Sequence, residues 1–364
     1  MAERILFLSS VGVTLRHFVA DLAAEMQTFG YETVGVAGSM VDVPGFDTLH
    51  ELPPFRRQGP ADIARAYRAL EQIVRGSRPD LLHLHTPFAL ALGRVAARRA
   101  GVPSLAVAHG TLLRPLGIHA LIYAMCEAPA ARLAAETICE NEEDARFYRR
   151  FCRQDSVSVA PVGGLGLDMD RLHLARTTPI RLAARPSIVV VGRLTPDKNL
   201  DRVMEAFHLL REREPRASLT FIGSAVGGEL AWEVPKESGV EHVKWVEDPY
   251  PLIAGADLLI SASRREGFSL TVAEAIALGV PVVAVDNRGV RQVVRSGAIG
   301  LTIVPDDRAA LALRMLETLH QEPKVLVQPG HDWSRRSALD FHRAAIERVL
   351  AKRRGPRASE RHIA

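Results

Sequence analysis

Residues 256–274 read ADLLISASRREGFSLTVAE, and this stretch carries the strongest structural signal in the sequence. The apolar run 256–261 has the length of a buried strand, and apolar residues recur at helical spacing over 270–278. Gly279 closes that predicted helix. A buried strand that enters a helix after a short loop is typical of parallel α/β sheets.

The loop and the start of the helix hold candidate binding groups. Unpaired N–H groups at a helix N-terminus suit a phosphate. Glu274 falls on the apolar stripe of the helix, where a carboxylate is costly unless a partner hydrogen-bonds it. A core arginine or a hydroxylated ligand could be that partner, and the sequence leaves both open.

The alternation of strand and helix extends outward in both directions, and it restarts after the Gly/Pro-rich passage 161–166. Further strands are predicted at 4–10, 32–37, 81–85, 104–108, 187–191, 218–222 and 281–285, and further helices at 14–29, 61–75, 89–100, 199–212 and 336–350. The sequence therefore predicts an α/β fold with two doubly wound parallel-sheet domains.

The expected domains follow from this pattern. We expect an N-terminal domain at 1–160, a linker at 161–186 and a second domain at 187–335. The helix at 336–350 is expected to pack back on the N-terminal domain, before a basic flexible tail at 351–364. Ligands of such sheets bind at the carboxyl ends of the strands.

The composition is that of a globular protein, with 364 residues of which 47% are hydrophobic and 24% charged. No apolar run reaches the roughly 18–20 residues of a membrane span, and the first residues lack a secretory signal pattern. The three cysteines show no zinc-binding spacing. We therefore expect a cytoplasmic protein with reduced thiols.

A second stretch follows a buried strand at 187–191. Arg193 and Lys198 flank a turn there, before the next predicted helix. Two cations at this edge of a sheet can neutralise a diphosphate. The alternative is a pair of solvated surface charges.

Together these motifs resemble the GT4 family of retaining glycosyltransferases. A strand followed by Gly192-Arg193 and Lys198-Asn199 precedes Glu266-Gly267-Phe268 by about 70 residues, and Glu266 and Glu274 have the family's Glu-x7-Glu spacing. The strand that ends in His109-Gly110 and the run PDLLHLHTP at 79–87 also match. The start of the chain is most similar to the CapM-like branch.

The resemblance implies a GT-B fold, in which two Rossmann-like domains face each other across a cleft. It implies that Arg193 and Lys198 bind the donor diphosphate, that Glu274 binds the ribose and that Glu266 contacts the transferred sugar. His109 would lie near the reacting face of that sugar. The catalytic candidates are thus His109, Glu266, Arg193 and Lys198, and the other donor-binding candidates are Gly267, Phe268, Ser269, Leu270, Thr271 and Glu274.

The first turn of the first helix suggests an anion site. Arg16 and His17 are predicted to lie there, where the helix dipole disfavours cations unless an anion compensates. Gly12 and Gly110 join them as candidates for contact with the acceptor or an anion. The alternative for Arg16 is an exposed side chain that points away.

Two histidines on one strand raise the question of a metal. His83 and His85 are expected to face opposite sides of the strand 81–85 and to be structural, so that they could not chelate one ion together. Asp168-Met169-Asp170 spells a metal motif of another glycosyltransferase fold, but it follows the interdomain passage. No metal and no cofactor are expected.

The resemblance implies a retaining, metal-independent transfer of a hexose from a UDP-sugar to a saccharide, a lipid-linked saccharide or a small molecule. The alternatives are a sugar-nucleotide epimerase or phosphorylase of the same fold, or a non-catalytic sugar-nucleotide binder. Departures from the family at Gly223-Ser224-Ala225, 243–248 and Arg288–Gln292 leave the nucleobase open.

Partners are expected to be a nucleotide sugar and an acceptor, with no nucleic acid. Peripheral membrane contact through a basic face is a further prediction. That face would comprise Arg94, Arg98, Arg99, Arg146, Arg149, Arg150 and Arg153.

Overall fold

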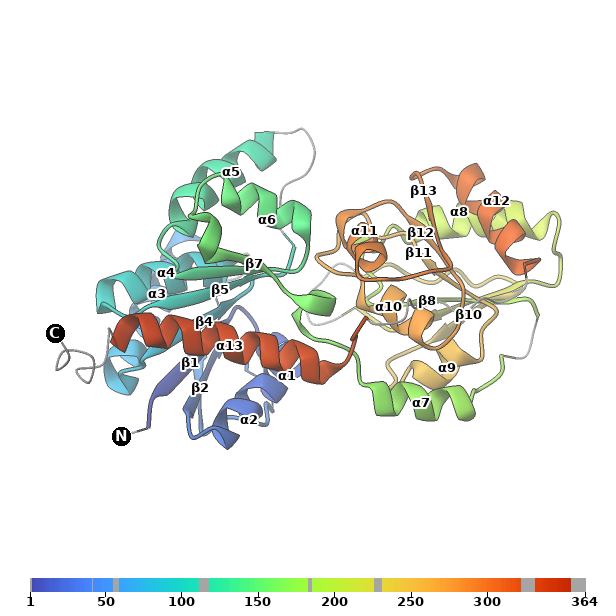
Figure 1. Cartoon of the computed structure of the whole chain (residues 1–364). Coiled ribbons are helices and arrows are strands. Elements are labelled where there is room, and N and C mark those ends of the chain that lie inside the picture. Colours follow the sequence, from blue (N-terminus) through green and yellow to red (C-terminus); the bar gives the residue numbers. More distant parts are fainter. Residues whose placement is uncertain are drawn as a thin grey trace. The chain divides into compact units, whose positions relative to one another are not determined.

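The computed structural model describes residues 2–40, 42–54, 59–110, 118–182, 185–225, 231–321 and 331–354, with the backbone alone for 118–124. The chain forms two compact units (Figure 1). Unit 1 comprises Met1–Leu165 and Arg336–Ala364, and unit 2 comprises Gly166–Arg335. The predicted α/β fold with two parallel sheets is confirmed.

Unit 1 is built on a parallel sheet in the order β3-β2-β1-β4-β5-β6-β7. Its strands are β1 (Arg4–Ser9), β2 (Glu32–Gly38), β3 (Thr48–Leu52), β4 (Leu81–His85), β5 (Ser104–Ala108), β6 (Glu136–Cys139) and β7 (Val157–Val159). Its helices are α1 (Gly12–Phe18), α2 (Ala20–Thr28), α3 (Pro60–Ser77), α4 (Pro87–Ala100), α5 (Ile118–Ala131), α6 (Glu142–Arg149) and α13 (Arg335–Arg354).

Both faces of this sheet are covered, and β1 shows how. Ile5 and Phe7 join a core cluster with residues of α1, α2 and α13. Leu6 and Leu8 join a second cluster with residues of α3 and α4. Alternate residues of a strand point to opposite faces, so an unbroken apolar run is what a doubly covered strand requires.

The C-terminal helix α13 belongs to unit 1 from Arg336 onward. Its buried residues Ala345, Ile346, Val349 and Leu350 lie in the same core cluster as β1. Ion pairs from Arg336 to Glu25 at 2.8 Å and from Arg348 to Glu136 at 2.7 Å add to this packing. The helix runs to Arg354, beyond the predicted end at 350. Residues 355–364 of the predicted tail lie outside the described residues.

Unit 2 has a parallel sheet in the order β10-β9-β8-β11-β12-β13. Its strands are β8 (Ser187–Val191), β9 (Ser218–Ile222), β10 (Val240–Val243), β11 (Leu258–Ser261), β12 (Val282–Val285) and β13 (Leu301–Val304). Its helices are α7 (Met169–Thr177), α8 (Leu200–Arg211), α9 (Tyr250–Ala254), α10 (Leu270–Ala277), α11 (Arg288–Arg295) and α12 (Arg308–Leu319). Within this unit, α8 and α12 lie on one side of the sheet and α9 and α10 on the other (Figure 1).

The two ends of unit 2 lie side by side. The Leu167 N–H donates to the carbonyl of Trp333 at 2.7 Å, and the Arg335 N–H donates to the carbonyl of Leu167 at 2.8 Å. This parallel bridge joins Leu167 and Ser334. The stretch 166–186, expected as a linker, instead supplies α7 to unit 2, where α7 packs on α9.

The first predicted helix is broken in two. One helix was expected up to Gly30, but α1 ends at Phe18 and α2 begins at Ala20. Val19 lies between them at φ −128° and ψ −26°, outside helical geometry, and its side chain is fully buried. The break changes where the charged residues of α1 stand relative to the helix ends.

Candidate functional site

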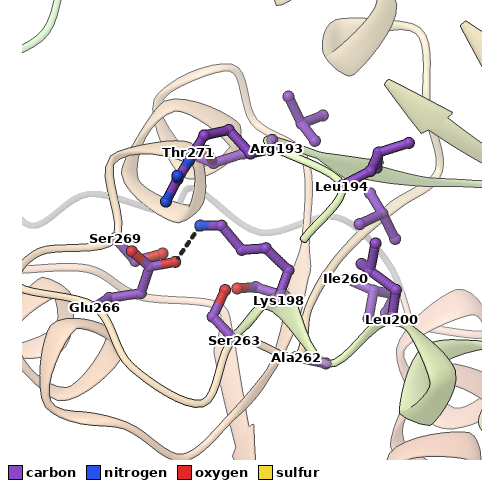
Figure 2. Close-up of a pocket in the computed structure, with 14 residues that line it drawn as sticks. Arg193, Leu194, Lys198, Leu200, Ile260, Ala262, Ser263, Glu266, Ser269 and Thr271 are labelled. Carbon is purple, nitrogen blue, oxygen red and sulfur yellow. Dashed lines mark hydrogen bonds and ion pairs between the residues drawn. The ribbon is translucent and has the colours of Figure 1, made fainter. Parts of the chain in front are cut away.

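A pocket in unit 2 lies where β8 and β11 end and α10 begins (Figure 2). It is lined by Arg193 and Lys198 from the loop after β8, and by Glu266, Ser269 and Thr271 from the loop after β11 and the start of α10. The carboxyl ends of adjacent parallel strands share one edge of a sheet, which brings these distant residues together.

The polar groups of this pocket form ion pairs. Lys198 Nζ donates to Glu266 Oε1 at 2.6 Å, and Figure 2 marks this bond across the pocket. Arg193 is about half exposed and lies 3.8 Å from the Asp197 carboxylate. The 3-10 turn Pro196–Lys198 and Asn199 in the left-handed region, at φ 56°, turn the chain from β8 into α8. Asparagine tolerates that conformation better than most residues.

Close backbone approach shapes the pocket rim. A Cβ on Gly289, at the start of α11, would lie 2.5 Å from Glu266 Cβ, so a glycine lets α11 pack on the Glu266 loop. Asn287 caps α11 by accepting from the Val290 N–H at 3.0 Å. Its Nδ2 donates to the Ser263 carbonyl at 2.9 Å, which ties the ends of β11 and β12 together.

Glu274 belongs to α10 and is not among the residues that line the pocket. The Tyr250 hydroxyl of α9 donates to Glu274 Oε1 at 3.1 Å. Burial raises the pKa of Glu274 to about 7, against the lowering effects of that hydrogen bond and of the Arg171 charge. Burial and the Glu274 charge raise the pKa of Tyr250. Arg171 stacks over the Tyr250 ring at 5.3 Å and pairs with Asp248 at 3.3 Å.

The structure thus places five predicted residues in one pocket: Arg193, Lys198, Glu266, Ser269 and Thr271. Gly267 and Phe268 are buried in the loop between them, and Leu270 begins α10. Sequence reasoning missed Tyr250, Arg171 and Asn287, which position the predicted residues. Their roles depend on packing between elements, for which the sequence carries no local signal.

Unit 1 places His109 and Gly110 at the end of β5. His109 Nδ1 lies 2.5 Å from Glu140 Oε1, and its Nε2 lies 2.9 Å from His85 Nδ1. His85 Nε2 in turn lies 2.7 Å from His83 Nδ1. The expectation that His83 and His85 face opposite sides of the strand is therefore wrong. Residues two apart on a strand share a face, and it is Leu82 and Leu84 that face the other core cluster.

Next to His85, where β1 and β4 end, the backbone is strained. Thr86 has φ 71°, which is a rare conformation for a β-branched residue. Its hydroxyl accepts from the Ser10 N–H at 3.0 Å and lies 2.6 Å from the Ser10 hydroxyl. Strain of this kind persists only where surrounding contacts enforce it.

Arg16 and His17 stand in the last turn of α1, not the first. The break at Val19 shortens the helix, so its C-terminal dipole end favours their positive charge and needs no anion. Arg16 is exposed and donates to the Asp42 carbonyl at 3.0 Å. Gly12 is buried at the start of α1, and Gly110 has φ 80°.

Not all arginines of the predicted basic face lie on the surface. Arg94 is fully buried and donates to Glu127 Oε1 at 2.6 Å, so it belongs to the interior of unit 1. Arg99 pairs with Glu71, Arg149 with Glu142 and Arg153 with Asp155. None of the helices in the described part of the chain is long and apolar enough to cross a bilayer.

Asp168 caps α7, where its side chain accepts from the Arg171 N–H at 3.1 Å. Within the described ranges, three or more histidine, cysteine or carboxylate side chains nowhere gather as a metal site would require. The Asp168 motif therefore has a local structural explanation.

Two family models match the chain. The model for glycosyl transferases group 1 matches residues 181–334, and the model for glycosyltransferase family 4 matches residues 16–163. The two matches fall on unit 2 and unit 1, respectively, and together span most of the chain.

Individual proteins show the same likeness. The chain is 28% identical to the glycosyltransferase EpsD of Bacillus subtilis (strain 168), over 96% of both chains. It is 26% identical to a D-inositol 3-phosphate glycosyltransferase of Streptomyces griseus, over 87% of this chain and 78% of that one. The structure of Anabaena Alr3699/HepE in complex with UDP and glucose has a TM-score of 0.68 and 16% identity, and the match covers 94% of this chain and 99% of that one. At this identity the structural likeness shows a shared fold.

Proposed function

Because this chain is a glycosyltransferase of the GT-B fold, we propose that it moves a hexose from a UDP-sugar to an acceptor hydroxyl. Unit 2 binds the donor in this proposal. The observation that carries it is the pocket in which Arg193, Lys198, Glu266 and the start of α10 meet. The structural neighbour from Anabaena holds UDP and glucose, which supports UDP as the carrier.

Departure of a nucleoside diphosphate leaves negative charge that the pocket can neutralise. Arg193 and Lys198 bring two cations, and the N–H groups at the start of α10 add partial positive charge. We propose that these groups replace a metal ion. Lys198 is paired with Glu266, so a bound diphosphate would compete with Glu266 for its ammonium group.

We propose further that the sugar keeps its anomeric configuration. In this scheme the leaving phosphate accepts the proton of the acceptor hydroxyl, so the pocket needs no carboxylate as general base. Glu266 then contacts sugar hydroxyls, and Glu274 binds the ribose in place of the Tyr250 hydroxyl.

Unit 1 binds the acceptor in this proposal, with His109, Gly110 and Gly12 at the strand ends. A saccharide, a lipid-linked saccharide and a small molecule are the candidate acceptors. The Streptomyces griseus relative is named for a cyclitol phosphate acceptor, which favours testing small polyols first. Peripheral membrane contact stays a prediction, and sedimentation with anionic vesicles at low salt tests it.

A thermal-shift panel tests the donor site. UDP, GDP, dTDP and ADP are each added to the full chain with Mg²⁺ or with EDTA. A ligand at about 100 times its Kd adds roughly 2.7 kcal/mol to the free energy of unfolding. We expect UDP alone to raise the melting temperature, equally in both buffers. A shift only with Mg²⁺ would contradict metal independence, and a flat panel would contradict the donor site.

Two variants separate the pocket from general charge effects. Lys198→Ala is expected to abolish the UDP shift, because it removes a pocket cation. Arg213→Ala is the matched control, since Arg213 is an exposed cation after α8, outside the pocket lining. NMR of the product formed by the wild type then reads the anomeric configuration, and inversion would contradict retention.

A further inference from the structure

Four polar side chains of unit 1 form one continuous hydrogen-bonded chain. It runs from Glu140 to His109, then to His85 and His83, with successive distances of 2.5, 2.9 and 2.7 Å. His83 and His85 are almost fully buried, and Glu140 is 6% exposed. The proposed function uses only His109 of these four residues, so the other three lack a role.

The sheet dictates this arrangement. β4, β5 and β6 are neighbours, and His85, His109 and Glu140 stand at their carboxyl ends in that order. His83 lies one pleat further into the sheet on the same face. The rings of Phe7 and His342 cover it at 5.1 and 5.7 Å between centroids.

The bonds determine where the protons lie. A carboxylate only accepts, so Glu140 requires a hydrogen on His109 Nδ1. With this one proton on the His109 ring, its Nε2 atom accepts from His85 Nδ1–H, and His85 Nε2 accepts from His83 Nδ1–H. Burial lowers the pKa of His85 and of His83 well below the usual range, which keeps both rings neutral.

The opposite direction needs one more proton in the hydrogen-bonded series. It would put a second proton on His109, and it would leave an N–H on His83 Nε2. That nitrogen is buried and has no hydrogen-bond partner. The proposed direction leaves it as a bare acceptor and keeps the three rings neutral.

We propose that Glu140 is a positioning residue that holds His109, His85 and His83 all in the Nδ1–H form. The carboxylate sets the direction of the chain, and the chain fixes the plane of the His109 ring. Because both ring nitrogens of His109 are engaged, the ring is held at one orientation at the end of β5. Its importance for turnover rests on the proposed function, but the proton positions do not.

NMR of the full chain labelled with ¹⁵N-histidine tests the proton positions without any substrate. The protein has 13 histidines, and spectra of His109→Ala, His85→Ala and His83→Ala assign the three signals. We expect three rings with a protonated Nδ1 and a bare Nε2, which is the less common form of free histidine. Nε2–H signals from His109 and His85 in the wild type would overturn the proposal.

Glu140→Gln tests the role of the carboxylate. The amide of glutamine can either accept from or donate to His109 Nδ1, so it no longer requires a hydrogen there. We therefore expect the three ring signals to show a mixture of the Nδ1–H and Nε2–H forms. Glu136→Gln is the matched control, because Glu136 is a buried glutamate on the same strand that bonds Arg348 and Ser158 instead. Unchanged ring signals in folded Glu140→Gln would overturn the assignment of Glu140.

Kinetics connect the chain to the reaction. Loss of an orienting partner behind a functional histidine typically costs about 10–100-fold. We expect Glu140→Gln to lower kcat by that factor with KM for the donor unchanged, and Glu136→Gln to change neither. Ring signals that change while kcat stays at the wild-type value would refute the positioning role and leave the donor site of unit 2 untouched. Failure of the UDP panel would instead refute the proposed function.

Discussion

Among the predicted donor ligands, Glu274 has a pKa that burial raises. Its folded-state pKa of about 7 stands above the ordinary value of 4.5. Because the pKa is higher in the folded state, the protonated carboxyl contributes to the free energy of unfolding. This contribution is complete at pH values below the pKa of the unfolded chain, and it is lost as the pH rises through 7. The difference of about 2.5 pKa units corresponds to roughly 3–4 kcal/mol, at 1.36 kcal/mol per pKa unit.

Glu274→Gln should remove this dependence, because the amide does not titrate. We expect the variant to match the wild type near pH 4.5 and to exceed its free energy of unfolding by roughly 3–4 kcal/mol at pH 8. Urea unfolding of both proteins at several pH values measures this. A difference that stays constant between pH 4.5 and pH 8 would argue against a titrating Glu274.

Gly289 allows the second residue-scale prediction. A methyl group there meets Glu266 Cβ at 2.5 Å, so Gly289→Ala must displace the Glu266 loop. We expect a loss of about 1–3 kcal/mol in stability and weaker UDP binding. The control is Gly76→Ala, in the last turn of α3, where an added Cβ meets nothing within 4 Å. Replacing that exposed helical glycine should stabilise by up to about 1 kcal/mol. Equal UDP affinity in both variants would contradict the prediction.

At this scale the sequence predicted the pocket well and the histidines poorly. The residues of the donor pocket are adjacent to strand ends, so a strand pattern plus a family motif was enough to group them. The contacts of Glu140 with His109, and of Tyr250 with Glu274, join residues 31 and 24 positions apart. They arise from strand order and helix packing, and nothing in the local sequence marks them.

At the scale of elements, α13 shows how much the packing of one helix contributes to the free energy of unfolding. Ile346 is fully buried in the cluster that it shares with β1, and Ile346→Ala should destabilise by about 2–5 kcal/mol. Glu347→Ala on the exposed side of the same helix is the control, with an expected change below about 0.5 kcal/mol. Urea unfolding measures both. Equal effects would mean that α13 does not pack as described.

Four of the five strands that the sequence missed stand at the edges of the sheets, and the fifth is β6. β3, β7, β10 and β13 are the four edge strands, and none was predicted. Few of their residues are buried, as the exposed residues of β3 show. Central strands such as β4 and β8 are apolar throughout because both faces are covered, and their bounds were predicted at 81–85 and 187–191. An unbroken apolar run is what makes a strand recognisable in the sequence. β6 is buried along its length, but Glu136 and Thr137 break its apolar run.

At the scale of the whole molecule, the two units differ in continuity. Unit 2 is one stretch, whereas unit 1 needs Arg336–Ala364 to complete its core. A fragment of residues 166–335 should therefore fold alone and keep the UDP shift. Residues 1–165 should not fold cooperatively, because Ile5 and Phe7 lose their cover from α13. Circular dichroism melts of the two fragments decide, and a cooperative melt of residues 1–165 would contradict this.

The bridge between Leu167 and Ser334 has a consequence for descent and engineering. A stretch whose two ends are hydrogen-bonded to each other is closed, like a cassette inserted into a host sequence. Insertions of this kind are tolerated because the two ends of the inserted domain lie close together. Recombination near Gly166 and Arg335 can therefore replace unit 2 by that of a relative and leave the sequence of unit 1 unchanged. In a chimera joined at these two positions, we expect the parent that supplies unit 2 to set the donor specificity and the parent that supplies unit 1 to set the acceptor specificity.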